Sequence, residues 1–172
     1  MTAATVSVSR RRLISSGLFA TLAATASFSG LFTAPALAHE TPCPYCKMTV
    51  TQDTPAQDNE VALRYGRKRI EYKCVWCAVA DVNRGTYKDS DVTVLAPTEK
   101  KSQPIEITRK AGKWAAPAGT VFLAVKASHQ ICQNTYRAFT SKAAFDAYVK
   151  KNQAIVKGAA PLTLDQMVAS AK

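Results

Sequence analysis

The stretch VALRYGRKRIEYKCVWCAVADVN, residues 61–83, carries two structural signals in succession. Its first part alternates apolar and polar residues on both sides of Gly66, which is typical of a β-hairpin with glycine in the turn. From Cys74 onward, apolar side chains recur three and four residues apart, which predicts a helix that ends at Gly85. The stretch therefore predicts a ββα unit, with Cys74 and Cys77 in the first turn of its helix.

A similar order of elements recurs toward the C-terminus, although the two sequences are not alike. Thr120–Lys126 and Tyr136–Phe139 predict two strands, and Ser141 predicts the N-cap of a partly buried helix that runs to about Lys151. We therefore expect an α+β fold, with antiparallel strands, helices on one side and two ββα-like units. Further strands are expected at Met48–Thr51, Asp91–Ala96, Ile105–Thr108 and Gln153–Val156. Apart from the strand at Met48–Thr51, residues 40–60 are expected to be loop. A connecting segment contains Trp114 and Pro117, and a final helix starts at Thr163.

The segment before the hairpin contains a second C-x-x-C pair, in Cys43-Pro44-Tyr45-Cys46-Lys47-Met48. Together with His39, Cys74 and Cys77, it places up to six donors within 39 residues. Thiolate and thioether sulfurs select Cu(I), zinc or iron–sulfur clusters over magnesium or calcium. These six residues, His39, Cys43, Cys46, Met48, Cys74 and Cys77, are the candidate metal ligands.

The local spacing of these donors favours shared coordination of one ion. Residues two apart on an extended chain face the same way, so Cys46 and Met48 can reach one ion together. Residues three apart on a helix share a face, and a helix N-terminus favours thiolates, which suits Cys74 and Cys77. A set of Cys and Met ligands is soft and fits Cu(I).

Residues 1–38 have the features of an export signal. They contain no acidic residue, carry Arg10-Arg11-Arg12, continue with a modestly apolar run and end in Ala36-Leu37-Ala38. A basic region, an apolar region and an A-x-A site form a secretory signal peptide, and adjacent arginines fit the twin-arginine type. We expect cleavage at its end, leaving residues 39–172 as one soluble periplasmic domain. His39 then becomes the amino terminus. Its α-amino group and imidazole could chelate a metal together, or the residue could be a frayed end with a solvated side chain.

The mature chain is basic. Three of the 23 Lys and Arg residues lie in the signal, so 20 remain against 12 Asp and Glu. The charges are scattered, which indicates a solvated surface more than a docking face for an acidic partner. We expect no nucleic-acid partner.

All five cysteines lie in the mature part. An exported protein meets an oxidising compartment, so disulfides are the default expectation, yet an odd number leaves one thiol for reactive or ligand chemistry. His129 and Cys132, three apart in an expected loop at residues 127–135, are either a further ligand pair or a solvated imidazole and a disulfide cysteine.

Three kinds of chemistry are open to the two C-x-x-C pairs. Besides Cu(I), the four sulfurs of Cys43, Cys46, Cys74 and Cys77 could form a closed zinc site. Cys43-Pro44-Tyr45-Cys46 also has the letters of a glutaredoxin active site, but that motif needs a strand before it and a helix after it. The third alternative is a module stabilised by zinc or disulfides, with Met48 as a core residue.

The order of these features resembles the NosL family of exported copper-binding accessory proteins, associated with nitrous oxide reductase maturation. The resemblance is carried by Cys43–Met48, similar to the family's C-x-M segment, by the glycine hairpin and cysteine of Tyr65–Cys74, and by Ala138–Lys142, similar to its A-F-x-S-K run. It spans most of residues 43–170.

This resemblance implies a monomer or weak homodimer of two ββα units that binds Cu(I) and delivers it to a periplasmic cuproprotein or copper transporter. We expect a metal carrier and no enzyme. By this resemblance, Cys46 and Met48 match the family's metal-binding motif and Cys74 matches a frequent family cysteine. Cys43, Cys77 and Cys132 are additional to the motif and could form disulfides or enlarge the site.

Overall fold

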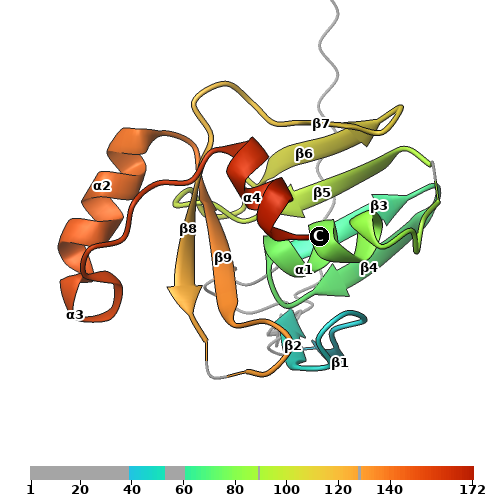
Figure 1. The fold of residues 1–172 in the computed structure, drawn as a ribbon, viewed down its shortest axis with the longest axis horizontal. Coiled ribbons are helices and arrows are strands. Elements are labelled where there is room, and N and C mark those ends of the chain that lie inside the picture. Colours follow the sequence, from blue (N-terminus) through green and yellow to red (C-terminus); the bar gives the residue numbers. More distant parts are fainter. Residues whose placement is uncertain (1–38, 53–60, 89, 128) are drawn as a thin grey trace, which may run out of the picture. The chain divides into compact units, whose positions relative to one another are not determined.

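The computed structural model describes residues 39–52, 61–88, 90–127 and 129–172, all within one structural unit (Figure 1). The expected signal peptide, residues 1–38, lies outside the described residues. The elements are β1 His39–Pro42, β2 Thr49–Gln52, β3 Val61–Tyr65, β4 Lys68–Tyr72, α1 Val75–Asn83, β5 Val92–Ala96, β6 Ile105–Lys110, β7 Lys113–Ala115, β8 Val121–Lys126, β9 Asn134–Phe139, α2 Lys142–Lys151, α3 Gln153–Val156 and α4 Leu164–Ser170.

A five-stranded antiparallel sheet, in the order β4-β3-β5-β6-β7, forms the centre of the fold. Its first hairpin pairs Tyr65 with Lys68, so only Gly66 and Arg67 make the turn. Gly66 has a φ of +56°, a conformation that glycine adopts without the steric cost of a Cβ. The predicted hairpin and its glycine turn are confirmed.

Two further hairpins stand outside this sheet. β1 pairs with β2, and β8 pairs with β9, each as a separate antiparallel pair. The expectation of loop at the start of residues 40–60 is wrong for residues 40–42, which belong to strand β1. Its Thr- and Pro-rich composition indicated loop, but antiparallel pairing with Thr49–Gln52 holds it extended.

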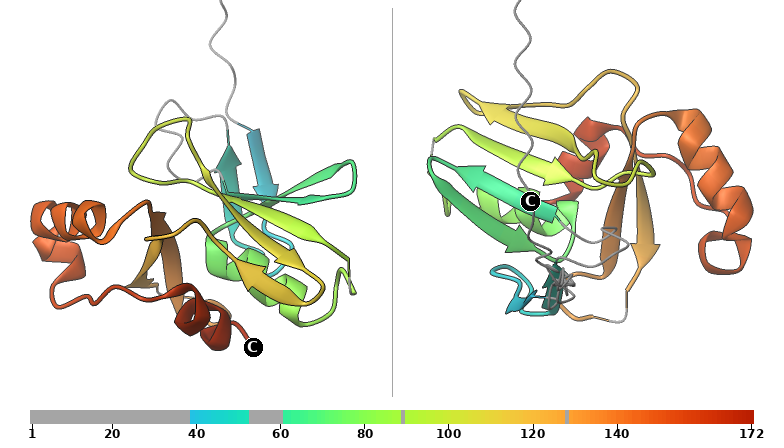
Figure 2. Two further views of the ribbon diagram at one scale, coloured as in Figure 1. Left: turned by 90° about the horizontal axis from the view of Figure 1, so that it is seen from above. Right: turned by 180° about the vertical axis from the view of Figure 1, so that it is seen from behind.

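The helices divide between two places in the fold (Figures 1 and 2). α1 and α4 contact each other and lie against the central sheet, whereas α2 packs on the β8–β9 hairpin. The Ser141 hydroxyl caps α2 by accepting from the Ala144 N–H at 3.2 Å, as expected. The structure thus confirms an α+β fold with antiparallel sheets, and contains both the β3-β4-α1 and the β8-β9-α2 succession.

Two expected elements are corrected. Gln153–Val156 is a helical turn rather than a strand, because the carbonyl of Asn152 accepts from the N–H groups of Ile155 and Val156 at 2.9 and 3.1 Å. Trp114 lies in a strand, β7, rather than in a connecting segment. A turn with positive φ at Ala111 and Gly112 returns β7 onto β6.

The main core lies between the central sheet, α1 and α4, and all five cysteines belong to it. α1 is buried on almost every side, because it contacts β3, β5, β9 and α4. Its buried Asp81 is hydrogen-bonded by the hydroxyls of Tyr72 and Thr86 and paired with Arg84. A smaller core joins α2 to the β8–β9 hairpin through Leu123, Phe139, Phe145 and Val156.

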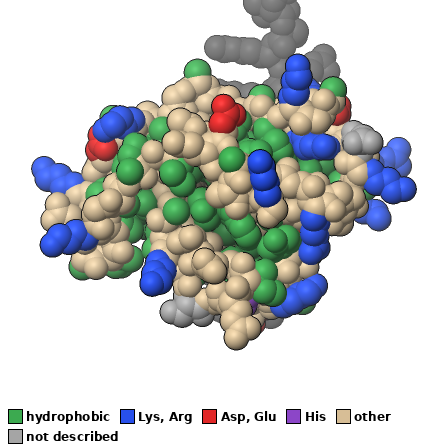
Figure 3. Space-filling view, in the orientation of Figure 1, with side chains coloured by type: hydrophobic (Ala, Val, Ile, Leu, Met, Phe, Trp, Pro, Cys, Tyr) green, Lys and Arg blue, Asp and Glu red, His purple; other side chains and the backbone are tan. Residues whose placement is uncertain are grey.

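Charged side chains are spread over the surface. In Figure 3, Lys and Arg lie around the outline of the face shown, and hydrophobic side chains gather across its middle. This distribution is in keeping with the expected solvated charge. Among the described residues, no helix combines the length and the hydropathy needed to span a membrane.

Candidate metal centre

A tight loop at the tip of the β1–β2 hairpin holds the first cysteine pair. The Cys43 N–H donates to the Met48 carbonyl, and the Lys47 N–H donates to the Cys43 carbonyl, both at 2.9 Å. Lys47 takes the left-handed conformation, with a φ of +64°, and its ammonium donates to the Pro44 carbonyl at 2.8 Å. The loop closes on itself, so the side chains of Cys43 and Cys46 are fixed relative to each other.

The second pair lies where β4 passes into α1. Cys74 is the N-cap of α1, and Cys77 lies one turn further on. Lys73 donates from its ammonium to the Thr49 carbonyl at 2.8 Å, which ties this segment to the β1–β2 hairpin. The sequence predicted this placement of Cys74 and Cys77 at a helix start.

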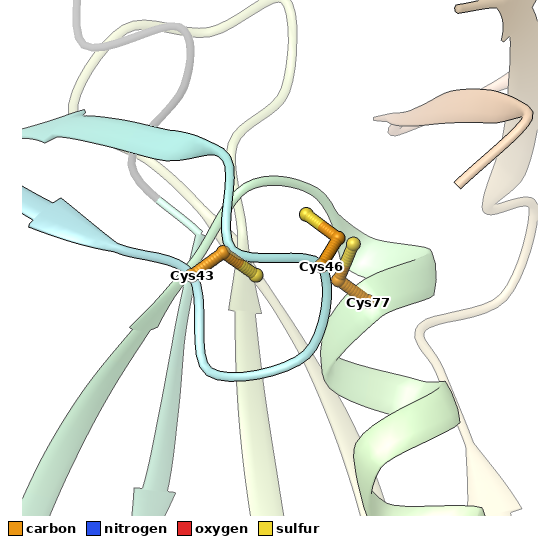
Figure 4. Close-up of side chains that lie close together, drawn as sticks. All are labelled: Cys43, Cys46 and Cys77. Atoms are coloured by element: carbon orange, nitrogen blue, oxygen red, sulfur yellow. The ribbon is translucent and has the colours of Figure 1, made fainter. Parts of the chain in front are cut away.

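Three sulfurs from these two places meet in the core. The Sγ atoms of Cys43, Cys46 and Cys77 all lie within 4.8 Å of one another (Figure 4). Three sulfurs bound to one metal at about 2.3 Å would lie about 4 Å apart. A small adjustment of rotamers would therefore let all three contact one ion, and the cluster has the geometry to hold a metal.

Cys74 and Cys132 extend this cluster. The Sγ of Cys77 lies 3.6 Å from that of Cys74 and 3.5 Å from that of Cys132. All five cysteines are free thiols, and none is more than 3% exposed. The expected disulfides are therefore not formed in this structure. Cys132 was singled out with His129 in the sequence, but its spacing gave no sign that it would reach Cys77.

The thiols of the cluster differ in pKa, because they donate and accept hydrogen bonds among themselves and are buried to different extents. Hydrogen bonding from the Cys77 thiol outweighs burial and lowers the pKa of Cys43 to about 5. The same donor lowers the pKa of Cys74. Donation to Cys43 and Cys74, together with burial, raises the pKa of Cys77. Burial chiefly, and the neighbouring Cys46, raise the pKa of Cys132 to about 12. The cluster thus favours thiolates at Cys43 and Cys74, which is the form that binds metals.

The other donors considered are His39, Met48 and His129. The His39 imidazole is exposed, and its Nε2 lies 3.6 Å from Glu71 Oε2, outside the sulfur cluster. Met48 is half-buried and packs against the core that contains the cysteines, while its carbonyl closes the loop. His129 lies beside the cluster, with Nδ1 3.8 Å from the Cys132 sulfur, and that nitrogen accepts from the backbone N–H groups of Ile131 and Cys132.

Aromatic side chains lie over the cysteine-bearing segments. Tyr45, between the first two cysteines, meets Trp76 edge-on at 5.5 Å between ring centroids, and Trp76 stacks on Tyr136 at 6.2 Å. The Arg84 guanidinium lies 4.9 Å from the Tyr45 ring centroid. Their positions in the sequence gave no sign of this arrangement. Tyr45, Trp76 and Tyr136 are partly buried and pack against the core that contains the five cysteines.

No known family model and no curated protein matches the chain. Among solved structures, it is similar to the mercury-bound form of MerB2, with 21% identity and a TM-score of 0.48 over 64% of this chain. The matched region is 55% of that protein's length, so the chain spans about half of it. A likeness of this size carries no functional conclusion. The resemblance to the NosL family stays a prediction.

Proposed function

We propose that this chain is an exported Cu(I)-binding protein that carries copper to a periplasmic partner, and that it is not an enzyme. The observation that carries the proposal is the convergence of the Cys43, Cys46 and Cys77 sulfurs within 4.8 Å. They come from a hairpin loop and a helix that the core holds together. Export, and delivery to a cuproprotein or transporter, follow from the signal-like residues 1–38 and from the resemblance to the NosL family.

The chemistry of the donors supports a soft ion. The cluster consists of thiols, and of the described carboxylates only Asp81 is buried, where Tyr72, Thr86 and Arg84 already occupy its oxygens. Magnesium and calcium need several oxygen ligands, which this core does not supply. Cu(I) has the opposite preference and binds thiolates readily.

Zinc is the second candidate, because one specific feature favours it. Two cysteines from a loop and two from a helix start are a usual set for a four-sulfur zinc site. The 3.6 Å between the Cys74 and Cys77 sulfurs is close to the edge of such a tetrahedron, about 3.8 Å for zinc–sulfur bonds of about 2.3 Å. Such a site would stabilise the fold and would not exchange its metal.

A thiol–disulfide oxidoreductase is less well supported. Cys43-Pro44-Tyr45-Cys46 lies in a loop followed by strand β2, not by the helix that the glutaredoxin motif needs. Exchange also requires a thiolate that another disulfide can reach, and both cysteines are at most 1% exposed. The low pKa of Cys43 alone does not overcome this burial.

Release of copper from a buried site requires part of the site to move. β1 and β2 form a sheet of their own and share no ladder with the central sheet, so the loop between them can move as a unit. Lifting this loop would withdraw Cys43 and Cys46 while Cys77 stays on α1. We propose this loop as the part that hands copper to a partner's ligands.

The test is native mass spectrometry of the protein purified anaerobically without reductant, followed by Cu(I) titration against a competing chelator. Cys46→Ser should weaken Cu(I) binding by more than about tenfold if the lost thiolate costs more than roughly 1.4 kcal/mol, and Met48→Leu tests whether the thioether adds to the site. Met167→Leu, another methionine of the same core, is the matched control and should bind as the unmodified chain does. Zinc retained until unfolding, with no copper uptake, would overturn the copper assignment.

A further inference from the structure

Cys77 occupies the centre of the five thiols. Its Sγ lies within 4.8 Å of those of Cys43 and Cys46, 3.6 Å from that of Cys74 and 3.5 Å from that of Cys132. These neighbours come from different segments of the chain. Cys43 and Cys46 belong to the β1–β2 loop, whereas Cys132 belongs to the segment between β8 and β9.

The number of thiols does not suit a single ion. A tetrahedral site uses four sulfurs and leaves one over, and a three-sulfur site leaves two. Two three-sulfur sites that share one sulfur use all five. The shared sulfur must lie close to every other member of the cluster, and Cys77 meets this condition.

We propose that the cluster holds two Cu(I) ions joined by the Cys77 thiolate. One ion is bound by Cys43, Cys46 and Cys77, and the other by Cys74, Cys77 and Cys132. This inference rests on the proposed Cu(I) function and adds Cys132 to the ligand set.

The distances fit a shared sulfur. Sulfurs around a three-coordinate metal lie about 4 Å apart for metal–sulfur bonds of about 2.3 Å. The Cys77 sulfur lies 3.6 Å from that of Cys74, 3.5 Å from that of Cys132 and up to 4.8 Å from those of Cys43 and Cys46, so these distances bracket the value of about 4 Å. The distances from Cys77 to its four neighbours are therefore those that a sulfur shared by two ions requires.

Binding involves no change of oxidation state. Each thiol that binds loses its proton to solvent as the S–H bond is replaced by a sulfur–copper bond, and copper enters and stays as Cu(I). Five thiolates and two Cu(I) ions leave a negative cluster. Backbone N–H groups that hydrogen-bond to the Cys43 and Cys74 sulfurs and the N-terminus of α1 offset part of that charge.

The segment between β8 and β9 is built to present Cys132. His129 Nδ1 accepts the N–H groups of Ile131 and Cys132, each at 3.3 Å, which folds the backbone back at this point. Cys132 is 1% exposed while its neighbour Ile131 is 50% exposed. His129 is therefore a positioning residue for Cys132, and its Nδ1 is not a metal ligand.

The experiment counts copper per chain by native mass spectrometry during anaerobic Cu(I) titration, and looks for a copper–copper distance by X-ray absorption. The unmodified chain should take up two ions and show a short metal–metal vector. Cys132→Ser should take up one ion and lose the vector, and Cys77→Ser should lose the vector as well. Ser170→Ala, a surface change near Tyr136, is the control and should keep both ions.

The outcomes separate the two proposals. One ion per chain, unchanged in Cys132→Ser, would overturn the two-ion cluster and leave Cu(I) binding standing. Two ions without a copper–copper vector would overturn the bridge through Cys77. No copper uptake at all would overturn the proposed function itself. The count and the vector of the unmodified chain decide the question even where a variant does not fold.

Discussion

The sulfurs of Cys77 and Cys132 lie 3.5 Å apart although 55 positions separate them in the chain. Cys77 is on α1, and Cys132 is carried by the segment that connects β8 to β9. The contact between α1 and β9 brings the two together. This part of the cluster therefore forms because the β3-β4-α1 unit packs against the β8–β9 hairpin.

Replacing the central thiol should change the acidity of its neighbours. Cys77 lowers the pKa of Cys43 to about 5 by donating a hydrogen bond. Cys77→Ala removes the donor, so thiolate absorbance in the metal-free protein should appear at higher pH, closer to the ordinary value of 9.0. Cys77→Ser keeps an O–H donor and is the matched control, with a smaller rise. The same titration curve in all three proteins would contradict the assigned donor.

The stability of the metal-free, reduced protein should depend on pH in two windows. Between about pH 5 and 9 the Cys43 thiol is protonated in the unfolded chain but not in the folded one, so the free energy of unfolding rises with pH. Above pH 9 the unfolded Cys132 thiol ionises first, because its folded pKa is about 12, so stability falls again. Urea unfolding across this range measures both slopes. Cys43→Ser should reduce the first slope to the part that Cys74 causes, and should keep the part of the second slope that Cys132 causes.

The hydroxyl of Tyr72 should contribute measurably to stability. It donates to Asp81 Oδ2 at 2.5 Å and meets the Tyr87 hydroxyl at 2.5 Å, and burial raises the pKa of Tyr72, which keeps the donor protonated. Tyr72→Phe leaves the buried carboxylate short of a donor and should cost about 1–3 kcal/mol in the free energy of unfolding.

The control for this change is Tyr136→Phe, whose hydroxyl meets Ser170 Oγ at 3.4 Å near the surface. It should alter stability by less than about 0.5 kcal/mol. Denaturant unfolding of both variants gives the comparison. Equal losses in the two variants would show that the Tyr72–Asp81 hydrogen bond adds nothing beyond an exposed one.

Metal binding should stabilise the protein unevenly. At a free Cu(I) concentration about a thousandfold above its Kd, the folded state gains about 4 kcal/mol. Hydrogen exchange should slow most in the Cys43–Met48 loop, the first turn of α1 and the segment around Cys132, because the proposed ligands lie there. Helix α2 belongs to the smaller core and should change little. Magnesium is the control ion and should have no effect, and uniform protection that includes α2 would argue against this site.

Local elements were predicted from the sequence where the pattern itself fixes them. The alternation around Gly66 gave the β3–β4 hairpin, and helical spacing from Cys74 gave α1 with its N-cap. Prediction of secondary structure failed where contacts with another segment of the chain determine the backbone conformation. His39–Pro42 becomes a strand only because Thr49–Gln52 pairs with it, and Gln153–Val156 is helical although its apolar residues suggested a strand.

By itself, the sequence determined which donors are available and how neighbouring donors are arranged. It contains two sulfur-rich C-x-x-C pairs, one in a loop and one at the start of a helix. Spacing of two or three residues decides which neighbours share a face, because backbone periodicity is local. Only the tertiary structure decided which sulfurs meet, that His39 lies beside Glu71 instead, and that Cys132 reaches Cys77. Such contacts depend on sheet register and on the packing of α1 against β9, and both are set by the burial of side chains from distant parts of the chain.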